Sequence, residues 1–324
     1  MLVDSFGRVA KDLRISVTDR CNFRCTYCMP DEGMQWLPRE ELLTFEEIER
    51  VARVCVERFG VESIRLTGGE PTLRAHLPVL VAKLARLGVD LAMTTNGVKL
   101  PESAADLRAA GLRRVNVSLD SLRPDRFLAL TRRDELPRVL AGIAAAQEAG
   151  FDPVKVNVVL VRGVNDDEVV ELAAWAREQG VQLRFIEFMP LDADGEWRAD
   201  KVVPAQEIVA AVDAVFPLEP VVRGAEPAAR YRYLDGEGEI GVVASVTQPF
   251  CGDCDRVRLT AEGQFRNCLF AVEEADLRSI LRGDGSDDDL AAAMQAEVAG
   301  KWAGHSIGQV RFVRPERTMS RLGG

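Results

Sequence analysis

Three cysteines near the start of the chain have a spacing that suits one inorganic centre. Cys21, Cys25 and Cys28 form a C-x3-C-x2-C pattern, which lets a single loop wrap three thiolates around that centre. A [4Fe–4S] cube has four irons, so three cysteines leave one iron without a protein ligand, and an open metal position is where chemistry can occur. A structural zinc ion would need a fourth ligand such as His or Cys. The only histidines, His76 and His305, are distant in sequence, and the pattern therefore favours an iron–sulfur cluster.

A second cysteine triplet lies towards the other end of the chain. Cys251, Cys254 and Cys268 follow a C-x2-C-x13-C pattern, which by itself fits zinc as well as an iron–sulfur cluster. All six cysteines could share one centre, but their separation in sequence favours two. Arg256 and Arg258 follow Cys254 closely and project to one side if this stretch is a strand. Two cations side by side indicate an anion beside the second triplet.

The chain as a whole is acidic, which limits the partners that it can attract. Its 324 residues carry 41 Lys and Arg against 51 Asp and Glu, a formal net charge of -10. Such a surface repels nucleic acid and anionic lipid, so we expect neither as a partner. The start of the chain lacks a signal-peptide pattern, and no run reaches the roughly 18 apolar residues of a membrane helix. We expect a cytoplasmic protein, and in that reducing compartment grouped cysteines favour metal or redox chemistry.

The elements that must position these residues alternate between strand and helix. Six short apolar runs are typical of strands that are buried on both faces. These runs are 13–17, 63–66, 90–93, 114–117, 154–160 and 181–188. Six βα units favour parallel strands with right-handed crossovers but are too few to close an eight-stranded barrel. We therefore expect an α/β fold, an open and partial six-unit βα barrel of the TIM type, with a doubly wound sheet as the alternative.

The helices between these strands have recognisable starts. Thr44 and Glu47 form a capping box, in which each side chain satisfies a free backbone N–H group. Cys55 falls on the apolar face of the helix that begins there, so we interpret it as a buried structural thiol. Later helix starts are expected at Pro124 and Asn165.

The pattern changes after residue 216, where Gly, Pro and short strand-like pieces become frequent. Residues 272–300 are typical of an acidic helical stretch that is interrupted around 283–285. We divide the chain into a barrel at 1–216 and a C-terminal extension at 217–324, which covers the opening of the barrel and carries the second triplet.

The first cysteine loop and a glycine-rich turn together resemble the radical S-adenosylmethionine (SAM) enzymes. The loop follows the first strand of a βα series, and Tyr27 fills the aromatic position that this family places before the third cysteine. The TGGEP turn at 67–71 follows the second strand and resembles the family's GGE motif, which hydrogen-bonds the amino group of SAM. A tight strand-to-helix turn would explain the glycines alone. Combined with the cysteine loop, they become a specific signal.

A closer resemblance, over residues 14–324, is to the GTP 3′,8-cyclase family of molybdenum cofactor (molybdopterin) biosynthesis. It rests on the second triplet, on the CDRVRL segment at 254–259 and on the terminal glycine pair. Leu322 stands where the family's tail commonly has Ile, and the acidic segment 283–290 has no clear counterpart. Neither departure touches the motif residues.

The resemblance implies a role for each motif residue. Cys21, Cys25 and Cys28 would hold a [4Fe–4S] cluster whose open iron chelates SAM. The second triplet would hold a [4Fe–4S] cluster whose open iron binds the guanine base of GTP. The residues that would contact SAM are Tyr27, Gly69, Ser118, Met189 and Arg184. Those that would contact GTP are Arg14, Arg65, Thr94, Lys155, Arg256 and Arg258. The C-terminal residues that would thread into the site are Gly323 and Gly324.

The activity that the resemblance implies is that of a radical SAM lyase. Reductive cleavage of SAM would give a 5′-deoxyadenosyl radical, which abstracts the C3′ hydrogen of GTP. Attack of the C3′ radical on guanine C8 would then give 3′,8-cyclo-7,8-dihydro-GTP. The implied partners are GTP, an external electron donor, a downstream cyclic pyranopterin monophosphate synthase and a second copy in a homodimer. The alternatives are another radical SAM enzyme, such as a peptide-modifying one, and a zinc-stabilised scaffold without catalysis.

Overall fold

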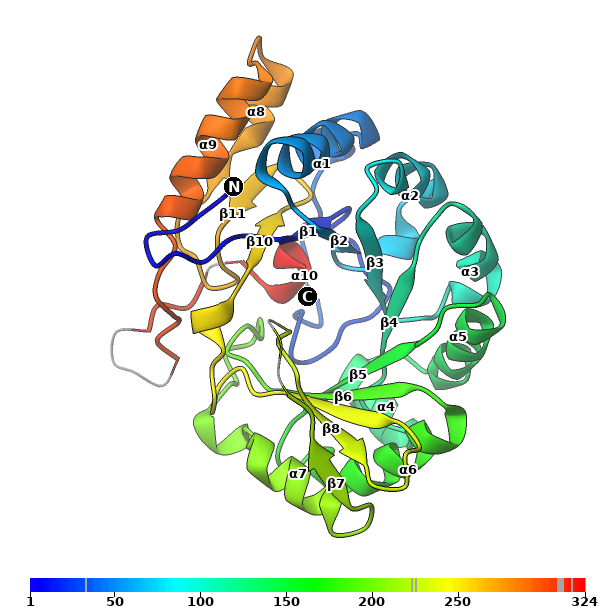
Figure 1. Cartoon of the computed structure of the whole chain (residues 1–324). Coiled ribbons are helices and arrows are strands. Elements are labelled where there is room, and N and C mark those ends of the chain that lie inside the picture. The colour runs from blue at the N-terminus through cyan, green and yellow to red at the C-terminus, as the bar shows by residue number, and fades with distance from the viewer. Residues whose placement is uncertain (33, 223, 225, 308–311, 316, 324) are drawn as a thin grey trace.

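Twelve strands of the computed structural model form one curved, mixed sheet (Figure 1). The structure describes residues 1–32, 34–222, 224, 226–307, 312–315 and 317–323. The order of the strands is β12-β11-β10-β1-β2-β3-β4-β5-β6-β9-β8-β7. The two end strands of this order, β12 and β7, do not pair with each other within the described residues. The barrel is therefore open, as expected from the number of βα units.

The six strands expected from the apolar runs form the parallel centre of the sheet. Each begins and ends within two residues of the expected range, because runs of buried apolar side chains define both ends. Neighbouring strands pair in sequence order from β1 to β6. They are β1 (Asp12–Ser16), β2 (Ser63–Thr67), β3 (Asp90–Thr95), β4 (Arg114–Ser118), β5 (Lys155–Leu160) and β6 (Gln182–Glu187).

Helices cover the convex side of this sheet (Figure 1). They are α1 (Phe45–Phe59), α2 (Leu77–Ala85), α3 (Leu100–Ala109), α4 (Pro124–Thr131), α5 (Leu136–Glu148), α6 (Val169–Gln179) and α7 (Ala205–Asp213). The capping box of Thr44 and Glu47 is confirmed. The helix start expected at Asn165 is confirmed: Asn165 is the N-cap residue of a 3-10 turn, Asp166–Glu168, that leads directly into α6. The Asn165 amide is also bonded to the strand ends, with Nδ2 donating to the carbonyls of Asp120 and Val159.

The C-terminal extension adds strands to both edges of the central sheet. Strand β9 pairs in parallel with β6, and β10 pairs in parallel with β1. The outer strands continue each side in antiparallel order. The strands of the extension are β7 (Leu218–Pro220), β8 (Ala229–Tyr233), β9 (Glu239–Val243), β10 (Arg256–Leu259), β11 (Gln264–Arg266) and β12 (Ala275–Asp276). The extension thus also continues the sheet, while the short helix α10 (Met319–Leu322) lies inside its curve (Figure 1).

The acidic stretch forms two helices, α8 (Leu277–Arg282) and α9 (Asp287–Ala299). Helix α9 packs on α1, and acidic residues at its start pair with arginines of α1. Asp287 accepts hydrogen bonds from Arg50 Nε at 2.7 Å and Arg53 Nη2 at 2.8 Å, and Asp288 pairs with Arg58. The acidic segment therefore fastens the extension to the barrel.

Two further expectations were a buried Cys55 thiol and a chain without a membrane-spanning helix. Cys55 is fully buried, and its Sγ lies 3.7 Å from Met294 Sδ of α9, which confirms a structural thiol. No helix of the described residues is long and apolar enough to cross a lipid bilayer.

Candidate active site

One cavity of about 660 Å³ occupies the inside of the curved sheet, and both cysteine triplets line it. Cys21, Cys25 and Cys28 reach it from the loop after β1, because the chain leaves each parallel strand at the same edge of the sheet. Cys251, Cys254 and Cys268 reach it from the segments around β10 and β11. Two groups that are far apart in sequence therefore face one space.

The first triplet lies in apolar and acidic surroundings. Burial raises the pKa of Cys21 to about 12 and raises that of Cys25 well above its ordinary value, and the charges of Glu70 on Cys21 and of Asp120 on Cys25 act in the same direction. The loop is closed by the Cys25 carbonyl, which accepts from the N–H groups of Cys28 and Met29 at 2.9 and 3.0 Å. A free thiol at these positions stays protonated, so a thiolate there requires a metal partner.

The GGE turn is held against the cysteine loop by backbone contacts. The N–H of Gly69 donates to the Thr18 carbonyl at 2.8 Å, and a Cβ on Gly69 would lie 2.4 Å from the carbonyl oxygens of Asp19 and Arg20. Only glycine fits such a close approach. Glu70 is buried and accepts hydrogen bonds from the Thr95 hydroxyl, from the backbone N–H of Asn96 and from Thr72. This carboxylate therefore joins the ends of β2 and β3 beside the first triplet.

Tyr27 has a buried partner that the motifs did not reveal. Its hydroxyl donates to Asp120 Oδ2 at 2.6 Å, and the other oxygen of Asp120 accepts from the Val159 N–H at 2.8 Å. Burial raises the pKa of Asp120 to about 6, against the effect of these two hydrogen bonds. Asn116 and Ser118 lie at alternate positions of β4, Asp120 continues this spacing just after the strand ends, and all three line the cavity. That alternation is the signal that could have found it.

The second triplet has cationic surroundings. Burial opposes the ionisation of Cys254, but the charges of Arg256 and Lys301 outweigh it and lower the pKa of this thiol to about 7. Arg256 Nη2 lies 3.4 Å from Cys254 Sγ, and the Lys301 ammonium lies 3.6 Å from it. The two triplets therefore differ in the charge around them.

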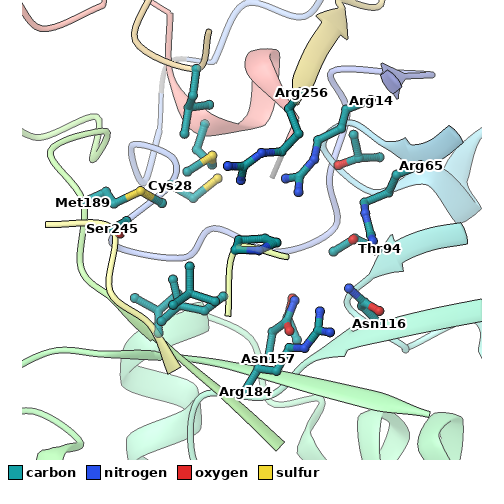
Figure 2. A pocket seen from close by; sticks show the side chains of 18 of the residues that line it. Arg14, Cys28, Arg65, Thr94, Asn116, Asn157, Arg184, Met189, Ser245 and Arg256 are labelled. Carbon is teal, nitrogen blue, oxygen red and sulfur yellow. The ribbon is translucent and has the colours of Figure 1, made fainter. Parts of the chain in front are cut away.

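A row of arginines crosses three neighbouring strands at this edge of the cavity. Arg258 of β10 is in register with Arg14 of β1, which is in register with Arg65 of β2. Figure 2 shows Arg14, Arg65 and Arg256 pointing into the cavity that Cys28 and Met189 also line. Burial lowers the pKa of Arg65 to about 9, and the neighbouring Arg14 adds to this effect.

Several polar atoms on this side of the cavity lack a protein partner. Among the described residues, Nε and Nη1 of Arg65 and Nε of Arg256 are buried without a hydrogen-bond acceptor. Nε of Arg14 also lacks a hydrogen bond, but it forms an ion pair with Asp12 at 3.6 Å. The amide oxygens of Asn116 and Asn157 are buried without a donor. Neither asparagine was expected from the motifs. Buried polar groups are rarely left unpaired, so this arrangement fits a polar ligand with several acceptor atoms.

The structure brings nearly all the predicted side chains to the cavity. Thr94, Ser118, Arg184 and Met189 line it from the ends of β3, β4 and β6, together with the residues described above. Lys155 does not: it is buried at the start of β5, where burial and then the charge of Arg184 lower its pKa to about 8. Its role in binding stays a prediction.

The C-terminal tail closes the cavity between the two triplets. Arg258 donates to the carbonyls of Leu322 and Gly323, and Met319 of the same segment lines the cavity. A Cβ on Gly323 would lie 2.6 Å from Ser16 Oγ, so glycine is required at this close contact. Gly324 lies outside the described residues.

Comparison with known proteins agrees with this geometry. Residues 15–176 match the model of the Radical SAM superfamily, and residues 181–307 match that of Molybdenum Cofactor Synthesis C. A GTP 3′,8-cyclase of Streptomyces coelicolor is 51% identical, with 100% of this chain and 96% of the relative covered. A GTP 3′,8-cyclase of Corynebacterium glutamicum is 48% identical, with 100% and 89% covered. The chain belongs to the GTP 3′,8-cyclase family. This membership also places it in the radical SAM superfamily.

Solved structures of other proteins share the fold of this GTP 3′,8-cyclase family member. Streptococcus suis SuiB bound to precursor peptide SuiA aligns with a TM-score of 0.66 at 13% identity, over 93% of this chain and 69% of that chain. Methylornithine synthase (PylB) aligns with a TM-score of 0.51 at 18% identity, over 65% and 63%. These similarities concern the fold alone.

Proposed function

We propose that this chain is a GTP 3′,8-cyclase. It catalyses the SAM-dependent radical cyclisation of GTP to (8S)-3′,8-cyclo-7,8-dihydroguanosine 5′-triphosphate, the first step of molybdenum cofactor biosynthesis. The observation that supports this most is a cavity that combines two cysteine triplets with several arginines, of which Arg14, Arg65 and Arg256 have buried donors without a hydrogen-bond acceptor among the described residues. The GTP 3′,8-cyclase relatives, at about half of all positions identical over the whole chain, support the same function.

The cysteine triplets fit two [4Fe–4S] clusters better than zinc. Within the described residues, no three His, Cys, Asp or Glu side chains close on a single metal ion. A structural zinc site needs four ligands around one ion. In a cubic cluster each cysteine binds a different iron, so the thiols face one space without converging on a point. Cys21, Cys25 and Cys28 would hold the first cluster, and Cys251, Cys254 and Cys268 the second.

The residues around the first triplet are suited to bind SAM. Backbone groups of the GGE turn, including Gly69, supply polar contacts for its amino group, while Ser118 and Met189 line the same part of the cavity. Tyr27 is fixed by Asp120, which leaves its ring beside Cys28. We also assign Arg184 to this pocket. When bound, SAM and the first cluster supply the 5′-deoxyadenosyl radical; the protein orients them and excludes water.

The arginine row is suited to bind the triphosphate of GTP. Each guanidinium can donate two parallel hydrogen bonds to phosphate, and each charged hydrogen bond contributes about 1.5–3 kcal/mol. The orphaned donors of Arg14, Arg65 and Arg256 match an acceptor-rich anion. Arg258 lies in the same row and also holds the C-terminal tail. Thr94 faces this region, and Lys155 adds a cation at the start of β5.

An assay with GTP tests the function directly. The chain is reconstituted anaerobically with iron and sulfide, for which we expect about eight irons from two cubic clusters. Incubation with SAM, a one-electron reductant and GTP should consume GTP and give the 3′,8-cyclised nucleotide, detected by mass spectrometry. Formation of 5′-deoxyadenosine and methionine with GTP unchanged would reject GTP as the substrate. The electron donor in the cell, the downstream synthase and a homodimer remain parts of this proposal.

Replacing one cysteine of the second triplet separates the two sites. Cys251→Ala should lower the iron content to about four per chain, keep SAM cleavage and abolish cyclisation of GTP. The readouts are iron content, 5′-deoxyadenosine and nucleotide product. Cys55→Ala is the matched control, because this buried thiol of α1 does not line the cavity and its loss should leave both clusters in place. Loss of SAM cleavage in Cys251→Ala, but not in the control, would show that the two sites are not independent.

A further inference from the structure

Lys301 is a buried lysine that contacts the second triplet but does not line the cavity. It follows helix α9, and only 5% of its surface is exposed. Its ammonium donates to the Cys254 carbonyl at 2.9 Å and to the Arg256 carbonyl at 3.0 Å. Its third contact is Cys254 Sγ, at 3.6 Å. All three contacts fall on the strand and loop that carry this cysteine.

The charge of Lys301 lacks a carboxylate counterion nearby. Among the described residues, no acidic side chain forms an ion pair with it, although Asp255 feels its charge at longer range. A buried ammonium is costly unless an anion compensates it. Two carbonyl groups satisfy its hydrogen bonds but carry only partial charges. The anion that Lys301 is placed to compensate is therefore a thiolate of the second triplet, together with whatever inorganic centre that thiolate binds.

The first triplet has no equivalent of this lysine among its described neighbours. Glu70 and Asp120 face Cys21 and Cys25, and Arg24 is the cation closest to Cys21. Around Cys254, Arg256 and Lys301 act together. The two triplets are thus distinguished by the sign of the charge that the protein fixes beside them.

We propose that Lys301 is a positioning and tuning residue for the second cluster: it holds the Cys254–Arg256 segment and makes this cluster easier to reduce. The inference rests on the proposed function, because it requires a cluster on the second triplet. One-electron reduction by an external donor adds one negative charge to an iron–sulfur cluster. A buried cation beside a ligand sulfur stabilises the more negative state, since charges interact strongly where water is excluded.

The test is a redox titration of the reconstituted full chain with dithionite, followed by electron paramagnetic resonance. In Lys301→Met, which keeps the length of the side chain but removes the charge, we expect the one-electron equilibrium of the second cluster to shift about tenfold towards the oxidised form, which is about 59 mV. The first cluster of the same molecule is an internal control and should keep its potential. Lys301→Arg keeps the charge and should shift the equilibrium less than Lys301→Met.

Two further variants separate the effect of the Lys301 charge from its structural support of the loop and from the loss of a lysine elsewhere. Lys301→Gln retains a hydrogen-bond donor for the carbonyls, so it separates the charge from the support of the loop and should shift the equilibrium in the same direction. Lys83→Met removes a surface lysine that pairs with Glu49 and should leave both potentials unchanged. If both clusters assemble in Lys301→Met and Lys301→Gln with wild-type potentials, the role of Lys301 is refuted. If the wild-type second triplet takes up no iron, the proposed function itself fails.

Discussion

Arg258, Arg14 and Arg65 form a row of like charges, although neighbouring cations repel one another. Burial further disfavours their charged forms and lowers the pKa of each. Asp12 forms an ion pair with Arg14 at 3.6 Å and also acts on Arg65, so it offsets part of this repulsion. A bound polyanion would offset the rest, and under the proposed function the triphosphate of GTP supplies that charge.

Asp120 gives a prediction on pH at the level of a single residue. Its pKa in the folded chain is raised to about 6, mainly by burial, above the value of about 3.9 for an unfolded chain. Between these pH values the folded state binds more protons, so the free energy of unfolding falls as the pH rises from about 4 to 6. Asp120→Asn lacks this titration, so its free energy of unfolding relative to that of the wild type should rise by up to ~3 kcal/mol between pH 4 and 6.

The measurement is urea unfolding of the cluster-free chain at several pH values. Asp125→Asn on helix α4 is the control, because Asp125 is exposed and the variant should follow the wild-type profile. Parallel profiles for Asp120→Asn and the wild type between pH 4 and 6 would contradict a raised pKa at this position.

At the level of elements, sequence patterns correctly predicted the strands and helix starts that are determined by neighbouring residues in the chain. The six central strands were expected because each is a run of apolar residues, and the start of α1 because Thr44 and Glu47 cap it. The pairing of β10 with β1 joins residues that are far apart in sequence, and no local pattern specifies such a partner. The same limit applied to the site. The motif residues were predicted, whereas the roles of Asp120 and Lys301 depend on contacts with Tyr27 and Cys254, which are distant in sequence.

Helix α9 carries the prediction for the acidic segment. Asp287 joins it to α1 through Arg50 and Arg53, and its side chain is only 20% exposed. Asp287→Ala should lower the free energy of unfolding by about 1–2 kcal/mol, because two charged hydrogen bonds are lost in a partly buried setting. The effect should weaken at high salt, which screens these charges. Urea unfolding at low and high ionic strength provides the measurement.

Asp284→Ala is the matched control for this prediction, because Asp284 is exposed and lies between the two helices. This variant should change stability by less than about 0.5 kcal/mol. Equal effects of the two substitutions would mean that the acidic composition of the segment matters, and not its contacts with α1.

At the scale of the whole molecule, the strand order of the sheet shows how the C-terminal extension is joined to the barrel. The extension was expected as a separate region at 217–324, yet its strands β9 and β10 complete the two edges of the central sheet. Their side chains that point away from the cavity, such as Ile240 and Val257, are fully buried in the main core. The second triplet therefore reaches the cavity on the segments that flank β10 and β11, two strands of the barrel sheet.

A truncated chain of residues 1–216 should consequently fail to fold alone. It would leave β1 and β6 with unpaired backbone groups and would expose the apolar surface that β9 and β10 cover, which is a template for aggregation. We expect soluble aggregates in size-exclusion chromatography and no cooperative thermal transition. A chain ending at Gly304 is the control, because it keeps strands β7 to β12 with helices α8 and α9 and should unfold cooperatively. A monomeric, cooperatively folding 1–216 fragment would contradict the dependence of the barrel on its extension.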